Sequence, residues 1–129
     1  PWHIALRHPD DTDKPAGTLS VSDTSIVTSG DYERYFIENG RRYHHIFDPH
    51  TGAPAQNGLR AVTVICKDSE KADILSTALF VMGEKKASLF WKEHRGEFQM
   101  ILFRNDNTLI ITPDLQKIFT SELPVVLIS

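Results

Sequence analysis

The sequence predicts an α+β domain in which a mostly antiparallel sheet packs beside two adjacent helices. Short β-branched runs separated by turn sequences indicate strands, and two consecutive segments with helical character lie in the second half of the chain. The chain has 129 residues, of which 40% are hydrophobic and 24% are charged, so it is long enough for one core. No internal repeat or composition shift marks a second domain, and residues 1–129 are expected to form one unit.

The first half of the chain reads as strands joined by turns. The expected strands are residues 2–6, 17–21, 25–29, 33–38 and 41–47. The last two flank Asn39-Gly40, which is the strongest short hairpin signal because both residues accept a positive φ. Residues 49–58 contain two prolines and two glycines and are expected to form a loop.

The second half begins with a β-branched strand at residues 61–66. Asp68 is a suitable N-cap for a helix that runs to about Met82 and is closed by Gly83, and a second helix fits residues 84–94. The remaining expected elements are a hairpin of residues 98–104 and 108–112, a helical turn at 114–119 and a closing strand at 125–128.

Charge and cysteine content narrow the classes of function. The formal net charge is −3 and no basic run is present, which argues against a nucleic-acid partner. No apolar run approaches the roughly 18 residues that span a bilayer. Cys66 is the single cysteine and lies in an apolar strand, so a buried, inert thiol is expected. The chain begins at Pro1 without an initiator methionine and is interpreted as a piece of a longer protein.

Asp73 and Thr77 stand out on the first helix. A wheel of residues 69–82 places an apolar stripe on one side and these two polar residues on another. The stripe contains Leu75, Ala78, Leu79 and Met82, widened by Ile74 and Val81, whereas Phe80 falls with the polar pair and Ser76 is adjacent. Residues at i and i+4 are neighbours, roughly 5–6 Å apart at Cβ. A carboxylate and a hydroxyl are oxygen ligands that suit Mg²⁺ or Ca²⁺.

A plain structural role explains the same pair. Asp73 can be exposed or can pair with Lys67 or Lys71, and Thr77 can donate a hydrogen bond back to the Asp73 carbonyl. Most of the helix is apolar, so a covered carboxylate would need compensation by a partner or a bound cation.

Histidines and a turn follow the predicted hairpin. His44 and His45 are successive strand residues and therefore face opposite sides, so one of them can face a ligand and transfer a proton. The stretch at residues 48–52 is a good turn sequence in which the histidines can equally be structural. The small residues at 29–32 suit either an anion-binding loop or a tight turn between strands.

These motifs, taken in order, resemble the C-terminal portion of the ApbE family, the FAD:protein FMN transferases. The matching segments are Pro1-Trp2 with the strand after it and residues 28–34, 43–49, 51–52, 62–64 and 72–83, which spread the resemblance over most of residues 1–112. The resemblance implies an ApbE-like α+β fold. It also implies an enzyme that uses a divalent metal to cleave FAD and attach FMN to a threonine of an acceptor flavoprotein. Some family members instead hydrolyse FAD to FMN and AMP.

The resemblance also assigns roles to individual residues. Asp73 and Thr77 match the metal ligands, for Mg²⁺ or Ca²⁺, with Ser76 as a further contributor. His45 matches a catalytic base beside the reacting phosphates, and Asp73 acts in catalysis through the metal. The expected cofactor-binding positions are Ser29, Gly30, Asp31 and Phe47. His50 departs from the family pattern, where a different residue is more usual.

The resemblance leaves three interpretations open: a transferase, an FAD pyrophosphatase and a non-enzymatic flavin-binding module. The N-terminal half of the family domain is absent from residues 1–129, so this half is an expected partner and weak FAD binding is expected without it. Many family members are lipoproteins outside the cytoplasmic membrane. A periplasmic or other extracytoplasmic location, through a lipid anchor outside this chain, is therefore expected.

Overall fold

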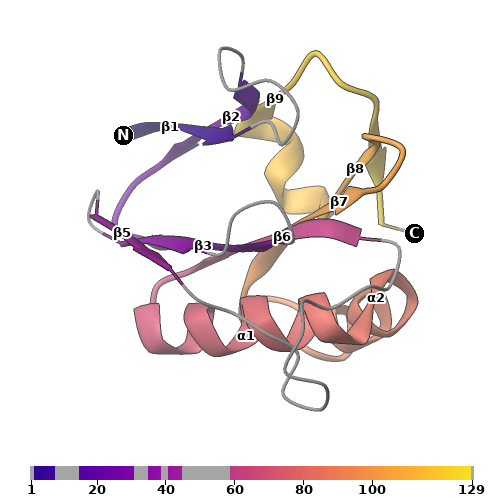
Figure 1. Ribbon diagram of the computed structural model, residues 1–129, viewed down its shortest axis with the longest axis horizontal. Coiled ribbons are helices and arrows are strands. Elements are labelled where there is room, and N and C mark those ends of the chain that lie inside the picture. The colour runs from indigo at the N-terminus through magenta and orange to yellow at the C-terminus, as the bar shows by residue number, and fades with distance from the viewer. Residues whose placement is uncertain (1, 8–14, 31–34, 39–40, 45–58, 129) are drawn as a thin grey trace.

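The computed structural model describes residues 2–7, 15–30, 35–38, 41–44 and 59–128 (Figure 1). The strands of the first half are β1 (Trp2–Arg7), β2 (Pro15–Val21), β3 (Ser25–Gly30), β4 (Tyr35–Glu38) and β5 (Arg41–His44). The later elements are β6 (Leu59–Cys66), α1 (Ser69–Met82), α2 (Glu84–Glu93), β7 (Gln99–Arg104), β8 (Leu109–Ile111), a 3-10 helix (Pro113–Lys117), β9 (Phe119–Thr120) and β10 (Val125–Leu127).

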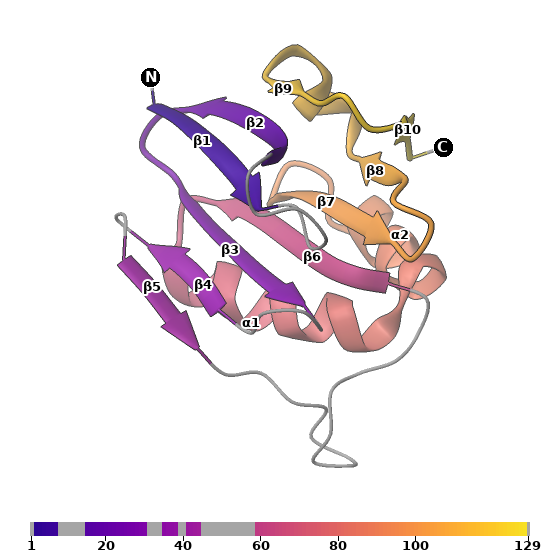
Figure 2. The same ribbon diagram turned by 45° about the horizontal axis from the view of Figure 1, so that its top comes forward.

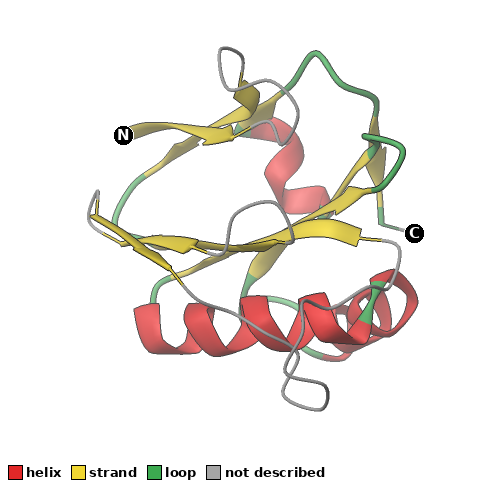
Figure 3. Ribbon diagram, viewed as in Figure 1, coloured by secondary structure: helices red, strands yellow, loops and turns green. Residues whose placement is uncertain are grey.

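The described elements form layers: a small outer sheet, a larger central sheet and a helical layer beneath it (Figures 1 and 3). The outer sheet has the order β1-β2-β9, and the central sheet has the order β10-β8-β7-β6-β3-β4-β5. Figure 2 shows β3 and β6 side by side in the middle, with α1 behind them. The paired strands in the described residues run antiparallel except β10, which runs parallel to β8. The predicted α+β class, with a mostly antiparallel sheet and two adjacent helices, is therefore confirmed.

The strands β3, β6 and β7 of the central sheet are buried on both faces, which explains their nearly continuous apolar sequences. Successive side chains of a strand point to opposite faces. The face toward the helices carries Val27, Val62, Val64, Met100 and Leu102, packed with Leu75, Leu79, Phe80 and Trp91. The face toward the outer sheet carries Ile26, Ala61, Ile65, Ile101 and Phe103, packed with Leu6, Leu19, Leu115 and Phe119. The strands β3 and β6 thus separate two distinct cores.

Local capping signals place α1 where the sequence predicts it. The side chain of Asp68 accepts hydrogen bonds from the backbone N–H groups of Glu70 at 3.0 Å and Lys71 at 3.3 Å. Gly83 adopts φ 85°, a conformation that glycine reaches without strain, and α2 follows at once. Cys66 is buried and free, as predicted, and its Sγ lies 3.8 Å from the carbonyl oxygen of Glu97.

The hairpin prediction is confirmed in its strands. β4 pairs antiparallel with β5, with Glu38 opposite Arg41, while the turn residues Asn39 and Gly40 lie outside the described residues. β7 and β8 form the second predicted hairpin, and the predicted helical turn is the 3-10 helix. No helix among the described residues is long and apolar enough to cross a membrane.

The predicted apolar stripe of α1 is confirmed at Leu75 and Leu79, but the buried side of the helix is turned away from the rest of the stripe. The buried residues are Ala72, Leu75, Ser76, Leu79 and Phe80. Ala78 and Met82 are only partly buried, and Ile74 is 68% exposed. The buried side of the helix is turned toward Ala72 and Phe80, which pack in the helix-side core. Ser76 is buried with them, and its hydroxyl has a partner on β3, which removes the cost of covering a polar group.

Candidate metal site

Asp73 and Thr77 lie on the same side of α1 and are joined through the backbone. Thr77 Oγ1 donates a hydrogen bond to the Asp73 carbonyl oxygen at 3.2 Å, and Ser76 Oγ donates to the same oxygen at 3.0 Å. Both Asp73 and Thr77 are partly exposed. The back-bond expected from a plain structural role is therefore present. The same bond uses the Thr77 hydroxyl proton, so the oxygen keeps its lone pairs for an electron-poor ligand.

The lysines proposed as partners for Asp73 do not neutralise it. Lys71 Nζ lies 3.0 Å from Glu97 Oε1, and this hydrogen bond raises the pKa of Lys71 and lowers the pKa of Glu97. Lys67 is exposed. Among the described residues the Asp73 carboxylate forms no ion pair, and Asp73 is partly exposed.

A second hydroxyl contact joins α1 to the central sheet. Ser29 on β3 donates a hydrogen bond from Oγ to Ser76 Oγ at 2.8 Å, and both serines are 0% exposed. Ser29 stands opposite Val62 in the β3–β6 register and therefore points to the helix side. Its predicted contact with a cofactor stays a prediction, because the hydroxyl seen here faces Ser76.

Gly30 is buried at the end of β3, opposite Ala61 on β6. The predicted site residues Asp31, His45 and Phe47, together with His50, lie outside the described residues, so their roles stay predictions. The described strand β5 ends at His44, and the strand order places β5 beside β4, which is the neighbour of β3.

The donor set on α1 fits a hard cation but is incomplete within the described residues. There, no group of three or more His, Cys, Asp or Glu residues is placed to hold a metal ion. One carboxylate and a hydroxyl are oxygen donors of the kind that Mg²⁺ and Ca²⁺ prefer. Mg²⁺ commonly takes one or two protein carboxylates and fills its other positions with water and phosphate oxygens. Asp73 and Thr77 therefore fit part of the coordination shell of such an ion.

Sequence reasoning missed the Ser29–Ser76 contact. The available signal was a serine on α1 one turn before Leu79 and Phe80, matched by a serine on an apolar strand. Neither residue indicates the other, because 47 positions separate them along the chain.

Comparison with known proteins places these elements in one family. The model of the ApbE family matches residues 1–102, and the chain belongs to this family. An FAD:protein FMN transferase of Treponema pallidum is 44% identical over 103 residues, which are 79% of this chain and 28% of that protein. A Klebsiella pneumoniae FAD:protein FMN transferase is 38% identical over 113 residues, covering 87% of this chain and 36% of that protein.

Solved structures of the family have the same fold. The ApbE protein of Thermotoga maritima superimposes with a TM-score of 0.70 at 35% identity, covering 92% of this chain and 38% of that chain. The flavin transferase ApbE of Vibrio cholerae gives a TM-score of 0.61 at 31% identity over 96% of this chain and 36% of that chain. The chain thus spans about a third of the length of these relatives.

Proposed function

We propose that this chain is the C-terminal part of an FAD:protein FMN transferase that uses a divalent metal, Mg²⁺ or Ca²⁺, and a threonine acceptor. The observation that carries the proposal is the oxygen pair of Asp73 and Thr77 on α1, in a chain 44% identical to an FAD:protein FMN transferase over 103 residues. FAD and an acceptor protein are implied by that homology.

The proposed reaction is a phosphoryl-type transfer. The acceptor threonine oxygen attacks the phosphorus of the FMN half of FAD, a new P–O ester bond forms, and the bond to the departing AMP breaks. A divalent ion held by Asp73 and Thr77 would neutralise charge on the pyrophosphate and on the leaving phosphate. Asp73 would contribute a charged ligand, and Thr77 would contribute a hydroxyl oxygen whose proton is already donated to the Asp73 carbonyl.

Other residues of this chain would act on the acceptor and the flavin nucleotide. His45 would remove the threonine proton, since a histidine exchanges protons near neutral pH. Gly30, the last residue of β3, and Asp31 would contact the cofactor, and the backbone at Phe47 would contact the flavin nucleotide. A segment outside this chain, corresponding to the N-terminal half of the family domain, would complete the FAD site. We further propose, on family resemblance, an extracytoplasmic location through a lipid anchor, which the residues encoded upstream of Pro1 would test.

The decisive experiment uses the full-length protein with FAD, Mg²⁺ and a threonine-containing acceptor peptide. The expected products are flavinylated peptide and AMP, measured by mass spectrometry and chromatography. Asp73→Ala should abolish both products while leaving the fold intact. Glu70→Ala is the matched control, because it removes an exposed carboxylate from the first turn of the same helix.

Two other outcomes would redirect the proposal. Release of free FMN and AMP, with no flavinylated peptide under any acceptor condition, would identify an FAD pyrophosphatase. Binding of FAD with no turnover at any Mg²⁺ concentration would identify a non-enzymatic flavin-binding module. Full activity of Asp73→Ala would refute the metal assignment.

A further inference from the structure

The hydroxyl pair of Ser29 and Ser76 forms a directed chain of hydrogen bonds that ends at the candidate metal site. Ser29 Oγ donates to Ser76 Oγ at 2.8 Å, and Ser76 Oγ donates to the Asp73 carbonyl oxygen at 3.0 Å. A hydroxyl has one proton to donate, so Ser76, which donates its proton to the Asp73 carbonyl oxygen, can only accept from Ser29. The order of donors is therefore fixed from the sheet to the helix.

The Asp73 carbonyl oxygen is where this chain meets Thr77. Thr77 Oγ1 also donates to that oxygen, at 3.2 Å. Two hydroxyls thus bracket one backbone carbonyl, and one of them is held from β3 through Ser29. This arrangement orients the backbone that carries the Asp73 carboxylate. The Thr77 hydroxyl proton is directed to the Asp73 carbonyl oxygen, so the lone pairs of Thr77 Oγ1 remain available for a ligand.

The hydrogen bond between Ser29 and Ser76 lies within an interface that is otherwise mainly apolar. The interface between α1 and the central sheet consists mainly of apolar side chains such as Val27, Val62, Leu75 and Leu79, and apolar contacts carry no direction. A buried hydrogen bond requires a particular distance and angle. The serine pair, 0% exposed on both sides, therefore selects one rotation and one height of α1 against β3.

We propose that Ser29 and Ser76 are positioning residues for the metal-binding pair Asp73 and Thr77: they hold α1 against β3 so that both ligands meet one divalent ion. This inference rests on the proposed function. It gives Ser29 a role through Ser76 and α1, in addition to the cofactor contact expected from its sequence position.

The test measures Mg²⁺ affinity of the full-length protein by calorimetry, separately from catalysis. Ser76→Ala and Ser29→Ala should each weaken Mg²⁺ binding about 10-fold, within the range usual for residues that orient metal ligands. For Ser76→Ala, the Mg²⁺ concentration that gives half-maximal FMN transfer should rise by the same factor, and saturating Mg²⁺ should restore most of the rate. The Ser29→Ala/Ser76→Ala double variant should bind Mg²⁺ no less tightly than the single variant with the lower affinity, because Ser29 acts only through its contact with Ser76.

Thr63→Val is the matched control. It also removes one hydroxyl from a buried pair with a 2.8 Å separation, which joins β3 to β6 on the opposite face of β3. Its Mg²⁺ affinity should equal that of the unsubstituted protein, although its unfolding midpoint in denaturant should fall. If Ser76→Ala does not fold, Ser29→Ala remains informative because it leaves the Ser76 bond to Asp73 in place.

The outcomes separate the two proposals. If the unsubstituted protein binds Mg²⁺ and both serine variants bind it equally well, the positioning role is refuted and the proposed transferase stands. If both variants and Thr63→Val weaken binding alike, the effect is general loss of stability and the inference also fails. If the unsubstituted protein binds neither Mg²⁺ nor Ca²⁺, the metal-dependent function fails and the positioning role fails with it.

Discussion

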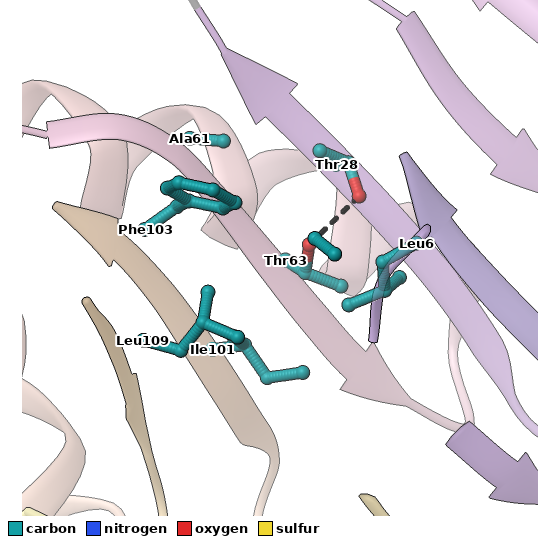
Figure 4. A pocket seen from close by; sticks show the side chains of 8 residues that line it. Leu6, Thr28, Ala61, Thr63, Ile101, Phe103 and Leu109 are labelled. Carbon is teal, nitrogen blue, oxygen red and sulfur yellow. Dashed lines mark hydrogen bonds between the residues drawn. The ribbon is translucent and has the colours of Figure 1, made fainter. Parts of the chain in front are cut away.

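Two pairs of hydroxyl groups with the same oxygen–oxygen distance lie on opposite faces of β3, and each pair buries its polar groups in a different way. Thr28 and Thr63 approach to 2.8 Å on the face toward the outer sheet, where they line a small cavity of about 10 Å³ (Figure 4). Ser29 and Ser76 approach to 2.8 Å on the face toward the helices. Consecutive residues of one strand thus send their hydroxyls into two different cores.

The difference lies in what else holds the partners. Thr28 and Thr63 stand directly opposite each other in a β3–β6 pairing that runs from Ser25 to Gly30, so backbone hydrogen bonds already determine their separation. Ser29 and Ser76 belong to a strand and a helix, which meet mainly through apolar side chains. The threonine pair therefore adds to a geometry that exists without it, whereas the serine pair helps to set the geometry. The comparison predicts loss of stability on one face and loss of function on the other.

The largest effect is expected from a steric change on the outer-sheet face. A Cβ atom at Gly17 would overlap the Phe119 ring and would lie 2.9 Å from the Thr120 carbonyl oxygen. Because β9 must move, Gly17→Val should lower the free energy of unfolding by about 3 kcal/mol, near the upper end for overpacking. Chemical denaturation measures this loss, with Ser20→Ala on the same strand as a mild control. Unchanged Mg²⁺ affinity of the folded protein would show that the two faces are independent.

The next effect is functional and belongs to the helix face. Thr77→Val keeps the side-chain shape of a partly exposed residue and removes the proposed ligand oxygen. Mg²⁺ affinity should fall by about 10-fold to 100-fold, at least as much as for residues that only orient ligands. Calorimetric titration of the full-length protein checks this. Thr63→Val makes the same chemical change on the other face, and an equal loss of affinity there would contradict the comparison.

A smaller effect is expected from the threonine pair itself. Thr63→Val leaves the Thr28 hydroxyl buried without this partner and should cost about 1–2 kcal/mol. Adding Thr28→Val removes the stranded hydroxyl and should recover most of that loss, since removing both partners can be nearly neutral. A double-mutant cycle by denaturation measures the coupling. Strictly additive losses would show that the two hydroxyls do not depend on each other.

The smallest effect is expected from an exposed contact between helix and sheet. Arg104 on β7 donates to both carboxylate oxygens of Glu84 on α2, at 2.8 Å and 2.7 Å, and these hydrogen bonds lower the pKa of Glu84. A lowered pKa in the folded state gives stability that is present above the ordinary value of 4.5 and is lost as the pH falls through the folded value. The side chains are 35% and 38% exposed, so solvent screening keeps the gain below about 1 kcal/mol.

Denaturation of the Glu84→Gln variant across acid and neutral pH tests this contact. The variant should lose part of the pH dependence on the acid side and should differ little from the unsubstituted protein at low pH. Mg²⁺ affinity at neutral pH should not change, in contrast to the buried serine pair. If Glu84→Gln lowers Mg²⁺ affinity more than Ser76→Ala does, the ion pair of Glu84 and Arg104, and not the serine pair, orients the helical layer.

The sequence by itself determined the elements whose signals are local. Asp68 and Gly83 mark the ends of α1 because capping depends on hydrogen bonds and backbone angles within a few residues. The strand runs and the two hairpins were predicted for the same reason. For the candidate site, the i and i+4 spacing of Asp73 and Thr77 predicted that they share one side of a helix, as the structure has them.

Only the tertiary structure decided what depends on contacts between distant parts of the chain. The parallel placement of β10 beside β8, the rotation of α1 and the burial of Ser76 all follow from such contacts. A helical wheel predicts the buried side of α1 from its apolar residues and counts Ser76 as polar. The cost of burying a hydroxyl is removed, however, when a hydrogen-bond partner is present. That partner, Ser29, lies 47 residues earlier in the chain.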